Sequence, residues 1–315
     1  MAIIKKTEIP NSEDTSLILL IQGAPGVGKT TICDSAENPF LLDIDHGLKR
    51  VKPEHRVDSS DSKSFEEIKA DVEEAKKLGY KTLIIDTVGA LLDSITAYII
   101  KENPKNAQPD GTLTLKAYGV LKGIFLNFSA DVRASFKNVI FVFHEVASRD
   151  NDGNTFYDII AVGSAKTLVY QPADLACRMF VQGGKRYLGF TPTEQYNAKS
   201  SFGIKGLIEV PELKDGDKND FLTRLFALAR QNIQKEAEAF APQNEAYDLA
   251  IKAGMEIVNG LEKPEDVPAI LEAIAGIKHA TTSEKEIKAA LKKKMTELGI
   301  TYDKATKTYI SAPAK

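Results

Sequence analysis

The feature that most constrains this chain is a glycine-rich turn that joins an apolar run to a stretch able to form a helix. The apolar run is Leu17–Ile21, and the turn reads Gly-Ala-Pro-Gly-Val-Gly-Lys-Thr over residues 23–30. Glycines let backbone N–H groups wrap phosphate oxygens, and the following helix adds its positive dipole end. The pattern predicts a P-loop in which Lys29 reaches the β- and γ-phosphates of ATP and Thr30 binds Mg²⁺. The residues expected to hold the nucleotide are Gly23, Ala24, Pro25, Gly26, Val27, Gly28, Lys29, Thr30 and Thr31.

A carboxylate for the metal follows a later apolar run, Thr82–Ile85, which ends at Asp86. The carboxyl ends of parallel strands meet at one edge of a sheet. Asp86 is therefore expected opposite Thr30, holding Mg²⁺ directly or through water. The alternative is that Asp86 only caps the next helix, a role that Thr87 is also able to fill.

Hydrolysis also needs a group that orients or deprotonates the attacking water. The candidates are Asp43, Asp45, His144 and Glu145. Asp45 ends the strand after the P-loop helix and is expected beside the γ-phosphate. His144 ends a later strand at the same edge and is expected to sense that phosphate. Each has an alternative role as a loop or capping residue.

Short apolar runs alternate with amphipathic stretches, which predicts an α/β fold with a mostly parallel sheet flanked by helices. Pro242 predicts a boundary between a core at 1–241 and a small helix-rich C-terminal domain at 242–315, lysine-rich near its end. Expected strands are 17–21, 40–45, 82–86 and 139–143; expected helices are 64–78, 90–100, 115–135, 164–170 and 221–240; expected loops are 103–111 and 148–154, with a hairpin turn at 183–184 and β character at 301–310.

Composition and charge narrow the class further. No apolar run reaches the ~18 residues of a membrane span, and the N-terminus does not resemble a signal peptide. Cys33 and Cys177 lack nearby partners, so reduced thiols in a cytoplasmic protein (host cytoplasm for a viral source) are expected. The net charge is −3, yet residues 281–315 hold eight Lys against four Asp and Glu. That excess favours either a nucleic-acid surface or a solvated helix face.

These motifs together resemble the RecA superfamily. Asp86-Thr87-Val88-Gly89-Ala90-Leu91 is similar to the RecA-type Walker B segment, and Leu42–Lys49 is similar to the Leu-Asp-Thr-Glu-Gly-Gly segment of phage-type ATP-binding proteins. Those proteins include RecA-like single-strand annealing ATPases. The loop 103–111, the strand ending at His144, and the stretch from Gly163 through Arg178 extend the resemblance over Leu17–Gly203. It implies a RecA-like P-loop NTPase core.

The resemblance also implies roles for individual residues. Asp45 falls where many relatives have a catalytic Glu, and Lys199 falls where RecA-like assemblies place a lysine that reaches a neighbour's ATP. The predicted catalytic set is Lys29, Asp45, His144 and Lys199. The two DNA-binding loops of such proteins correspond to segments carrying Lys101, Lys105, Lys116, Arg149, Phe156, Tyr157 and Lys166, while Asp150, Asp152 and Asp158 in the second segment repel phosphate.

Two functions of different classes follow. The first is an Mg-dependent ATPase that binds single-stranded DNA as a ring or filament and promotes annealing or strand pairing, with a single-stranded DNA-binding protein as a further partner. The second is a nucleotide-gated assembly or regulatory ATPase without a DNA role, which the acidic second loop and the net charge favour. A small-molecule kinase would need an Arg-rich lid, and a GTPase an Asn-Lys-x-Asp segment after a strand; neither is evident.

Overall fold

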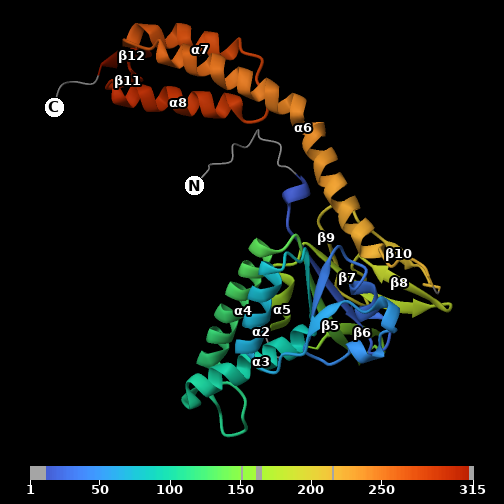
Figure 1. The fold of residues 1–315 in the computed structure, drawn as a ribbon. Helices are drawn as coiled ribbons and strands as arrows, with labels where there is room; N and C mark the ends of the chain where they lie inside the picture. The colour runs from blue at the N-terminus through green and yellow to red at the C-terminus, as the bar shows by residue number, and fades with distance from the viewer. Residues whose placement is uncertain (1–11, 150–151, 161–164, 215, 312–315) are drawn as a thin grey trace. The chain divides into compact units, whose positions relative to one another are not determined.

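The computed structural model describes residues 12–149, 152–160, 165–214 and 216–311 (Figure 1). The chain divides into two compact units, one formed by Asn11–Ile233 and one that contains Gln234–Lys315. The division falls inside one long helix, α6 (Phe221–Asn259), and not at Pro242, which lies within that helix. The expected helix end at Phe240 is therefore wrong. Helix-forming Glu, Ala and Gln residues on both sides of Pro242 offset its cost of ~3 kcal/mol.

A ten-stranded sheet forms the centre of the larger unit. Eight strands follow the order β10-β8-β7-β1-β5-β4-β2-β3, while β6 pairs with β5 and β9 pairs with β7 outside that order. The strands from β7 to β3 along this order run parallel, and β8 and β10 add antiparallel strands. The strands are β1 (Leu17–Gly23), β2 (Pro39–Asp43), β3 (Asp58–Ser60), β4 (Thr82–Asp86), β5 (Asn138–Arg149), β6 (Thr155–Ile159), β7 (Leu175–Gln182), β8 (Lys185–Gly189), β9 (Lys199–Ser200) and β10 (Leu207–Val210).

Helices cover both faces of this sheet (Figure 1). One apolar cluster joins one face to α2 (Phe65–Lys77), α3 (Val88–Glu102), α4 (Leu115–Ser135) and α5 (Ala165–Tyr170). A second cluster joins the other face to α1 (Lys29–Cys33) and the first turns of α6. Short 3-10 turns complete the connections at Ser12–Asp14, Leu48–Arg50, Pro53–His55 and Pro104–Asn106. The two clusters make the predicted α/β architecture, a mostly parallel sheet with helices on both sides.

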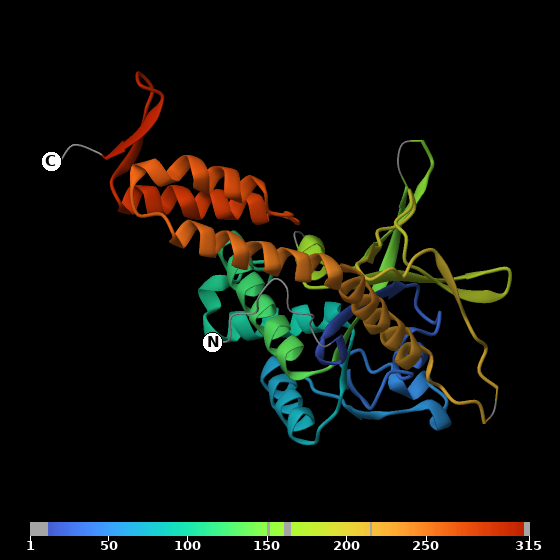
Figure 2. The same cartoon turned by 90° about the horizontal axis from the view of Figure 1, so that it is seen from above.

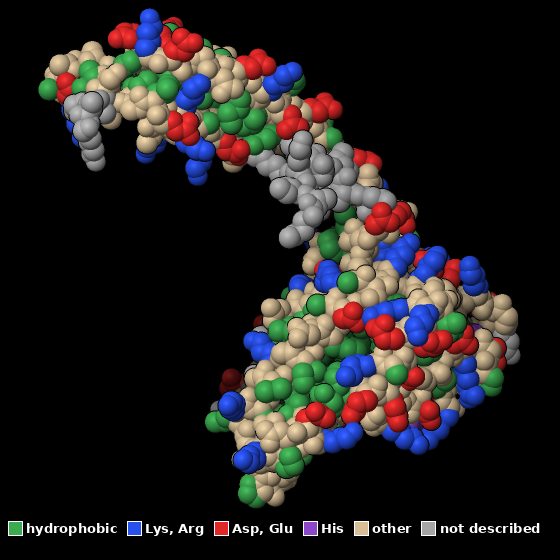
Figure 3. Space-filling model, turned by 60° about the vertical axis from the view of Figure 1, so that its left-hand side comes forward, with side chains coloured by type: hydrophobic (Ala, Val, Ile, Leu, Met, Phe, Trp, Pro, Cys, Tyr) green, Lys and Arg blue, Asp and Glu red, His purple; other side chains and the backbone are tan. Residues whose placement is uncertain are grey.

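Several expected elements lie where the sequence indicated. Ser64 caps α2 through a capping box with Glu67, and α4 covers the expected residues 115–135. The Gly183-Gly184 turn joins β7 to antiparallel β8. Figure 3 views one face of the larger unit, and hydrophobic side chains gather there. A groove between α2, α3 and α4 is lined in part by Phe65, Tyr98 and Phe128.

The first two residues of the expected loop at 148–154 belong to a strand, whereas the described residues 152–154 lie outside any strand, as expected. The polar residues Ser148 and Arg149 belong to β5, which pairs with antiparallel β6 from Glu145↔Ile159 to Arg149↔Thr155. Polar residues are tolerated there because this end of β5 is exposed and gains its backbone hydrogen bonds from β6. Figure 2 shows the β5–β6 hairpin standing away from the sheet. Asp150 and residues 161–164 lie outside the described part of the chain.

The C-terminal unit has its own apolar cluster. It is built from the later turns of α6, α7 (Val267–Ala275) and α8 (Ser283–Glu297), with Ile300 and Tyr309 from the hairpin formed by β11 (Ile300–Asp303) and β12 (Thr308–Ser311). A 3-10 turn at Pro264–Asp266 precedes α7. The hairpin confirms the β character expected near 301–310. Among the described residues, no helix has both the length and the apolar character needed to cross a bilayer.

Candidate nucleotide site

The P-loop connects β1 to α1 and encloses the Lys29 ammonium. Gly26 and Gly28 adopt φ of 78° and 105°, a region that favours glycine, and these two turns give the loop its cradle shape. Gly23 is required for a different reason, since a Cβ there would lie 2.6 Å from the Met179 carbonyl oxygen. Lys29 Nζ donates to the carbonyls of Gly23 at 2.8 Å and Ala24 at 3.0 Å. Burial lowers the pKa of Lys29, and nearby Asp86 opposes that shift.

Thr30 and Asp86 meet at the same edge of the sheet. The Thr30 hydroxyl donates to Asp86 Oδ2 at 2.7 Å, and Asp86 is only 4% exposed. Burial raises the pKa of Asp86, while the Thr30 hydroxyl and Lys29 lower it. Thr87 caps α3 by accepting from the Ala90 N–H, so Asp86 is not needed as the cap. A hydroxyl and a carboxylate oxygen this close are the donors that Mg²⁺ prefers, and the pair fits such an ion beside a nucleotide.

Asp45 and His144 complete a chain of contacts to Lys29. His144 Nε2 lies 3.0 Å from Asp45 Oδ2, and His144 Nδ1 lies 3.3 Å from Lys29 Nζ. The arrangement follows from the strand order, because β5 lies between β1 and β4 and its His144 emerges between the P-loop and Asp86. An imidazole held between a carboxylate and an ammonium is able to orient a water molecule and to pass a proton.

The other two candidates for that role are already engaged. Asp43 accepts from the backbone N–H groups of Gly47 and Leu48, at 2.6 and 3.1 Å, and so shapes the turn that carries Asp45. Glu145 is nearly buried and forms a bidentate pair with Arg178, with both distances 2.8 Å. The Arg178 guanidinium also lies over the Tyr157 ring of β6, 3.5 Å from its centroid. Glu145 therefore links the site to the β5–β6 hairpin.

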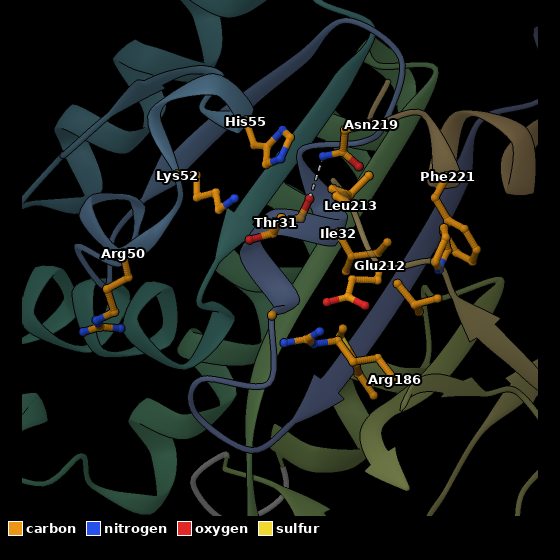
Figure 4. A pocket seen from close by; sticks show the side chains of 14 residues that line it. Thr31, Ile32, Arg50, Lys52, His55, Arg186, Glu212, Leu213, Asn219 and Phe221 are labelled. Carbon is orange, nitrogen blue, oxygen red and sulfur yellow. Dashed lines mark hydrogen bonds between the residues drawn. The ribbon is translucent and has the colours of Figure 1, made fainter. Parts of the chain in front are cut away.

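A pocket continues from the P-loop on the side of Thr31 (Figure 4). Its volume is 320 Å³, and Asn219 closes one side by donating to the Thr31 carbonyl at 3.0 Å. Arg186 lies at its floor and donates to the Val27 carbonyl at 3.0 Å. The lining is part cationic and part apolar: Gly28, Thr31, Ile32, Arg50, Lys52, His55, Met179, Arg186, Val210, Pro211, Glu212, Leu213, Asn219 and Phe221. Such a pocket has the character of a site for the nucleoside part of a nucleotide.

Asp34 lies directly after α1. Its carboxyl group is buried but takes no part in the contacts described above. It is 5% exposed, and neither carboxylate oxygen has a hydrogen-bond partner among the described residues. Burial raises the pKa of Asp34 to about 8, and the charges of Asp86 and Asp43 add to the shift. Asp34 therefore holds a proton at neutral pH.

The remaining candidates lie on several elements. Lys199 in β9 pairs with Ala176, three residues before the Met179 that lies beside Gly23, and its ammonium donates to the Ala173 carbonyl at 2.5 Å. It therefore points toward the amino end of β7, away from the P-loop of its own chain. Lys101 ends α3 and pairs with Glu66 at 2.8 Å. Lys105, Lys116 and Arg149 are exposed, Phe156 is half-buried in β6, and the side chain of Lys166 in α5 lies outside the description.

Sequence reasoning missed Arg178, Arg186 and Arg50 as site residues. Arg178 and Arg186 come from the β7–β8 hairpin, and Arg50 comes from the turn after β2. The only available signal was a cluster of basic residues after the Asp45 turn, at Lys49, Arg50, Lys52 and His55. Their placement depends on which strands are neighbours, and local sequence does not carry that information.

No curated protein sequence matches the chain. A solved structure of a KaiC-like protein from the hyperthermophilic archaeon Pyrococcus horikoshii aligns over 64% of this chain and 91% of that chain, at 13% identity and a TM-score of 0.35. A profile described as AAA domain matches residues 15–202, which is more than half of the chain. The chain belongs to this AAA domain family of P-loop ATPases.

Proposed function

We propose that the protein is an ATP-dependent recombination protein that binds single-stranded DNA and promotes annealing or strand pairing. One observation supports this most directly. A single strand, β5, carries His144 at the nucleotide edge and continues outward to Arg149 in the β5–β6 hairpin. A change at the nucleotide is therefore felt by a segment that is exposed and able to contact DNA.

At the nucleotide, each residue has a distinct part. Lys29 leaves the Gly23 and Ala24 carbonyls to bind phosphate oxygens, and the P-loop N–H groups hold the rest of the phosphate chain. Thr30 and Asp86 would hold Mg²⁺, which would supply positive charge to the phosphate group that is transferred. Asp45 keeps His144 oriented so that the imidazole positions the attacking water. The pocket beside Thr31 takes the nucleoside.

Binding of ATP changes the contacts of β5. Lys29 Nζ is shared between two loop carbonyls and His144, and a γ-phosphate competes for that ammonium. His144 then loses its contact with Lys29, while the next residue, Glu145, holds Arg178 and through it Tyr157. The two strands of the hairpin are thus biased by the nucleotide, which is what gating requires.

DNA contacts are assigned to two exposed segments. The hairpin offers Arg149 for phosphates and Phe156 for base stacking, and Lys166 belongs to the segment that follows. The connection between α3 and α4 offers Lys101, Lys105 and Lys116. In this proposal, copies of the chain assemble as a ring or filament, and a single-stranded DNA-binding protein delivers the strand.

The second candidate is a nucleotide-gated assembly or regulatory ATPase with no DNA role. The observation that favours it is the acidic content of the same hairpin, where Asp152 and Asp158 accompany Arg149. The net charge of −3 points the same way. In that case the gated hairpin contacts another protein chain.

Steady-state ATP hydrolysis with and without single-stranded DNA, at low and moderate salt, separates the two. DNA binding by the first candidate should raise hydrolysis and should weaken with salt, because phosphate contacts release counterions. Lys29→Ala is the control and should abolish turnover under all conditions. An absence of stimulation, together with no binding of single-stranded DNA in the ATP-bound state, would leave the assembly ATPase as the function.

A further inference from the structure

Charge is divided between the two halves of the C-terminal unit. Residues 234–272 contain nine Asp and Glu against three Lys, and residues 273–315 contain nine Lys against four Asp and Glu. The near balance of the whole unit therefore conceals an acidic first half and a basic second half. The basic half consists mainly of α8 and the β11–β12 hairpin. Such a separation attracts a polyanion to one end of the unit.

Helix α8 places lysines at the middle of its solvent face. Ser283, Ile287 and Leu291 are buried against the cluster of the unit, which fixes the inward side of the helix. At 3.6 residues per turn, the opposite side is made by Lys285, Ala289, Lys292 and Thr296, and all four are exposed. Ala289 and Thr296 are small, so neither obstructs the approach of a large surface to the two lysines.

The acids of α8 lie at the margins of that face and have partners. Glu284 pairs with Lys288 at 2.6 Å, and Glu297 lies 3.9 Å from Lys293. Glu286 accepts from the Tyr247 hydroxyl. Within the described residues, no ion pair involves Lys285 or Lys292. The charge at the centre of the face is therefore uncompensated.

Not every lysine of α8 lies on this solvent face. Lys294 is half-buried and donates to the Asn259 carbonyl at 2.6 Å, so it holds α8 against the end of α6. It is therefore excluded from the surface.

The β11–β12 hairpin extends the basic surface. Ile300 and Tyr309 join the apolar cluster, which anchors the two strands. Tyr302 is 50% exposed, and the turn that follows presents Lys304 and Lys307 to solvent. Asp303 accepts from the N–H groups of Ala305 and Thr306, so its charge is used to shape the turn.

We propose that α8 and the β11–β12 hairpin form a binding surface for double-stranded DNA. The major groove admits an α-helix, and the small side chain of Ala289, between Lys285 and Lys292, lets the helix approach closely while both lysines reach phosphates. Lys304 and Lys307 meet the adjacent backbone. This surface is separate from the proposed single-strand contacts of the core. It would bind the duplex that strand pairing produces.

The test uses the full chain carrying Lys29→Ala, which removes ATP turnover from the measurement. Binding of a fluorescent 20-base-pair duplex is followed by anisotropy over a range of salt, for this parent and for Lys285→Ala/Lys292→Ala. Loss of two phosphate contacts should weaken binding roughly tenfold or more at 0.1 M salt and should reduce the salt slope by about 1.8. Lys235→Ala/Lys252→Ala, which removes two exposed lysines from the acidic half, is the matched control and should bind as the parent does.

Three results would overturn the assignment. One is unchanged duplex affinity and salt slope in Lys285→Ala/Lys292→Ala. Another is an equal loss of single-strand binding, which would make the surface a general single-strand contact. The third is a loss of self-association in analytical ultracentrifugation with DNA binding intact, which would make it an interface between copies. Thermal unfolding should match the parent in both variants, since Ala is the best helix former. Failure here leaves the proposed function untouched, because that proposal is tested by hydrolysis at the core.

Discussion

Single charged side chains in this site differ mainly in how they are kept out of water. Lys29 is buried against two carbonyls, Asp86 is buried against a hydroxyl, and Asp34 is buried with neither. Burial shifts the pKa of each group, and the shift is opposed for Lys29 and Asp86, which have a hydrogen-bond partner or an opposite charge nearby, but not for Asp34. The contacts of Lys29 and Asp86 are ones that a nucleotide and a metal ion replace, whereas Asp34 has none to exchange.

His144 and Asp45 are expected to act on the chemical step. Asp45→Asn and His144→Ala should each lower kcat for ATP by roughly 10²–10⁴-fold, since that is the usual contribution of a positioned acid–base group. The KM for ATP should change little, because neither residue is assigned to phosphate binding. Steady-state kinetics measures both parameters, with Asp61→Asn, an exposed carboxylate, as the control. A large rise in KM at constant kcat would assign the pair to nucleotide binding instead.

Asp34 should make stability depend on pH. Its pKa is raised from 3.8 to about 8 in the folded state, so the folded chain keeps a proton that the unfolded chain has lost. The free energy of unfolding therefore falls as pH rises from about 4 to about 8, by at most ~1.4 kcal/mol per pH unit. Asp34→Asn should flatten this part of the profile. Denaturant unfolding at pH 5.5, 6.5 and 7.5 measures the two slopes, and identical slopes would mean that Asp34 is not protonated in the folded state.

Among the site residues, the sequence predicts those whose surroundings are set by nearby residues. Lys29, Thr30 and Asp86 could be assigned because a glycine turn and a strand end fix their environment within a few residues. The Glu145–Arg178 pair could not, since the two residues are 33 positions apart and meet only through strand order. Asp34 gave no signal at all, because its lack of partners is a property of the packed interior.

Among the secondary-structure elements, β5 does the most to connect parts of the larger unit. Its first half is buried between β1 and β4, and its second half leaves the sheet to pair with β6. The buried Glu145–Arg178 pair lies where the strand changes from one environment to the other. Its backbone is continuous from the P-loop edge to the hairpin, as the proposed nucleotide gating requires.

Breaking the Glu145–Arg178 pair should lower the stability of the fold, because the remaining charged side chain would stay buried without its partner. Removing one partner, in Glu145→Met or Arg178→Met, should lower the free energy of unfolding by about 3–5 kcal/mol, because an unpaired charge stays buried. The double variant should recover much of that loss. Chemical denaturation of all four proteins completes the cycle. If the double variant is as unstable as the sum of the singles, packing of the two side chains, rather than their charges, sets the cost.

The ends of helices and strands could be predicted from the sequence only where nearby residues determine them. The capping box of α2 and the extent of α4 were readable, since both depend on nearby residues. The last two residues of β5, Ser148 and Arg149, were expected in a loop because their polarity reflects exposure, whereas their strand conformation depends on pairing with β6. Edge strands as short as β3 and β9 carry too few residues to show a period.

The whole molecule combines an ATPase core whose class was predictable with a C-terminal unit whose fold was not. Alternating strands and helices imply a covered parallel sheet, but not that β5 lies between the P-loop strand and the Asp86 strand. That order determines which side chains meet at the site. In the C-terminal unit, the sequence shows an excess of lysines near the end, and only the packed structure separates outward Lys285 and Lys292 from inward Lys294.

A further prediction concerns Lys199 and the assembly of subunits. If it completes a neighbour's site, Lys199→Ala should lower hydrolysis while the isolated subunit binds nucleotide nearly as before. Mixing inactive Lys199→Ala subunits with inactive Asp45→Asn subunits should restore part of the activity, because some interfaces then pair an intact Asp45 with an intact Lys199. Hydrolysis is measured against mixing ratio. No recovery, with a lowered melting temperature for Lys199→Ala, would assign the lysine to its own chain through the Ala173 carbonyl.

Arg230 anchors the long helix α6 to the start of two central strands. Its guanidinium is 2% exposed and donates to the carbonyls of Thr15 and Lys137 and to the Asn138 side chain, where β1 and β5 begin. The opposite ends of those two strands carry the P-loop and His144. Arg230 therefore connects α6 to the amino ends of the two strands whose other ends carry the P-loop and His144. A tethered chain pulled through α6 should hydrolyse ATP at a force-dependent rate, and Arg230→Met should remove that dependence at forces the fold survives.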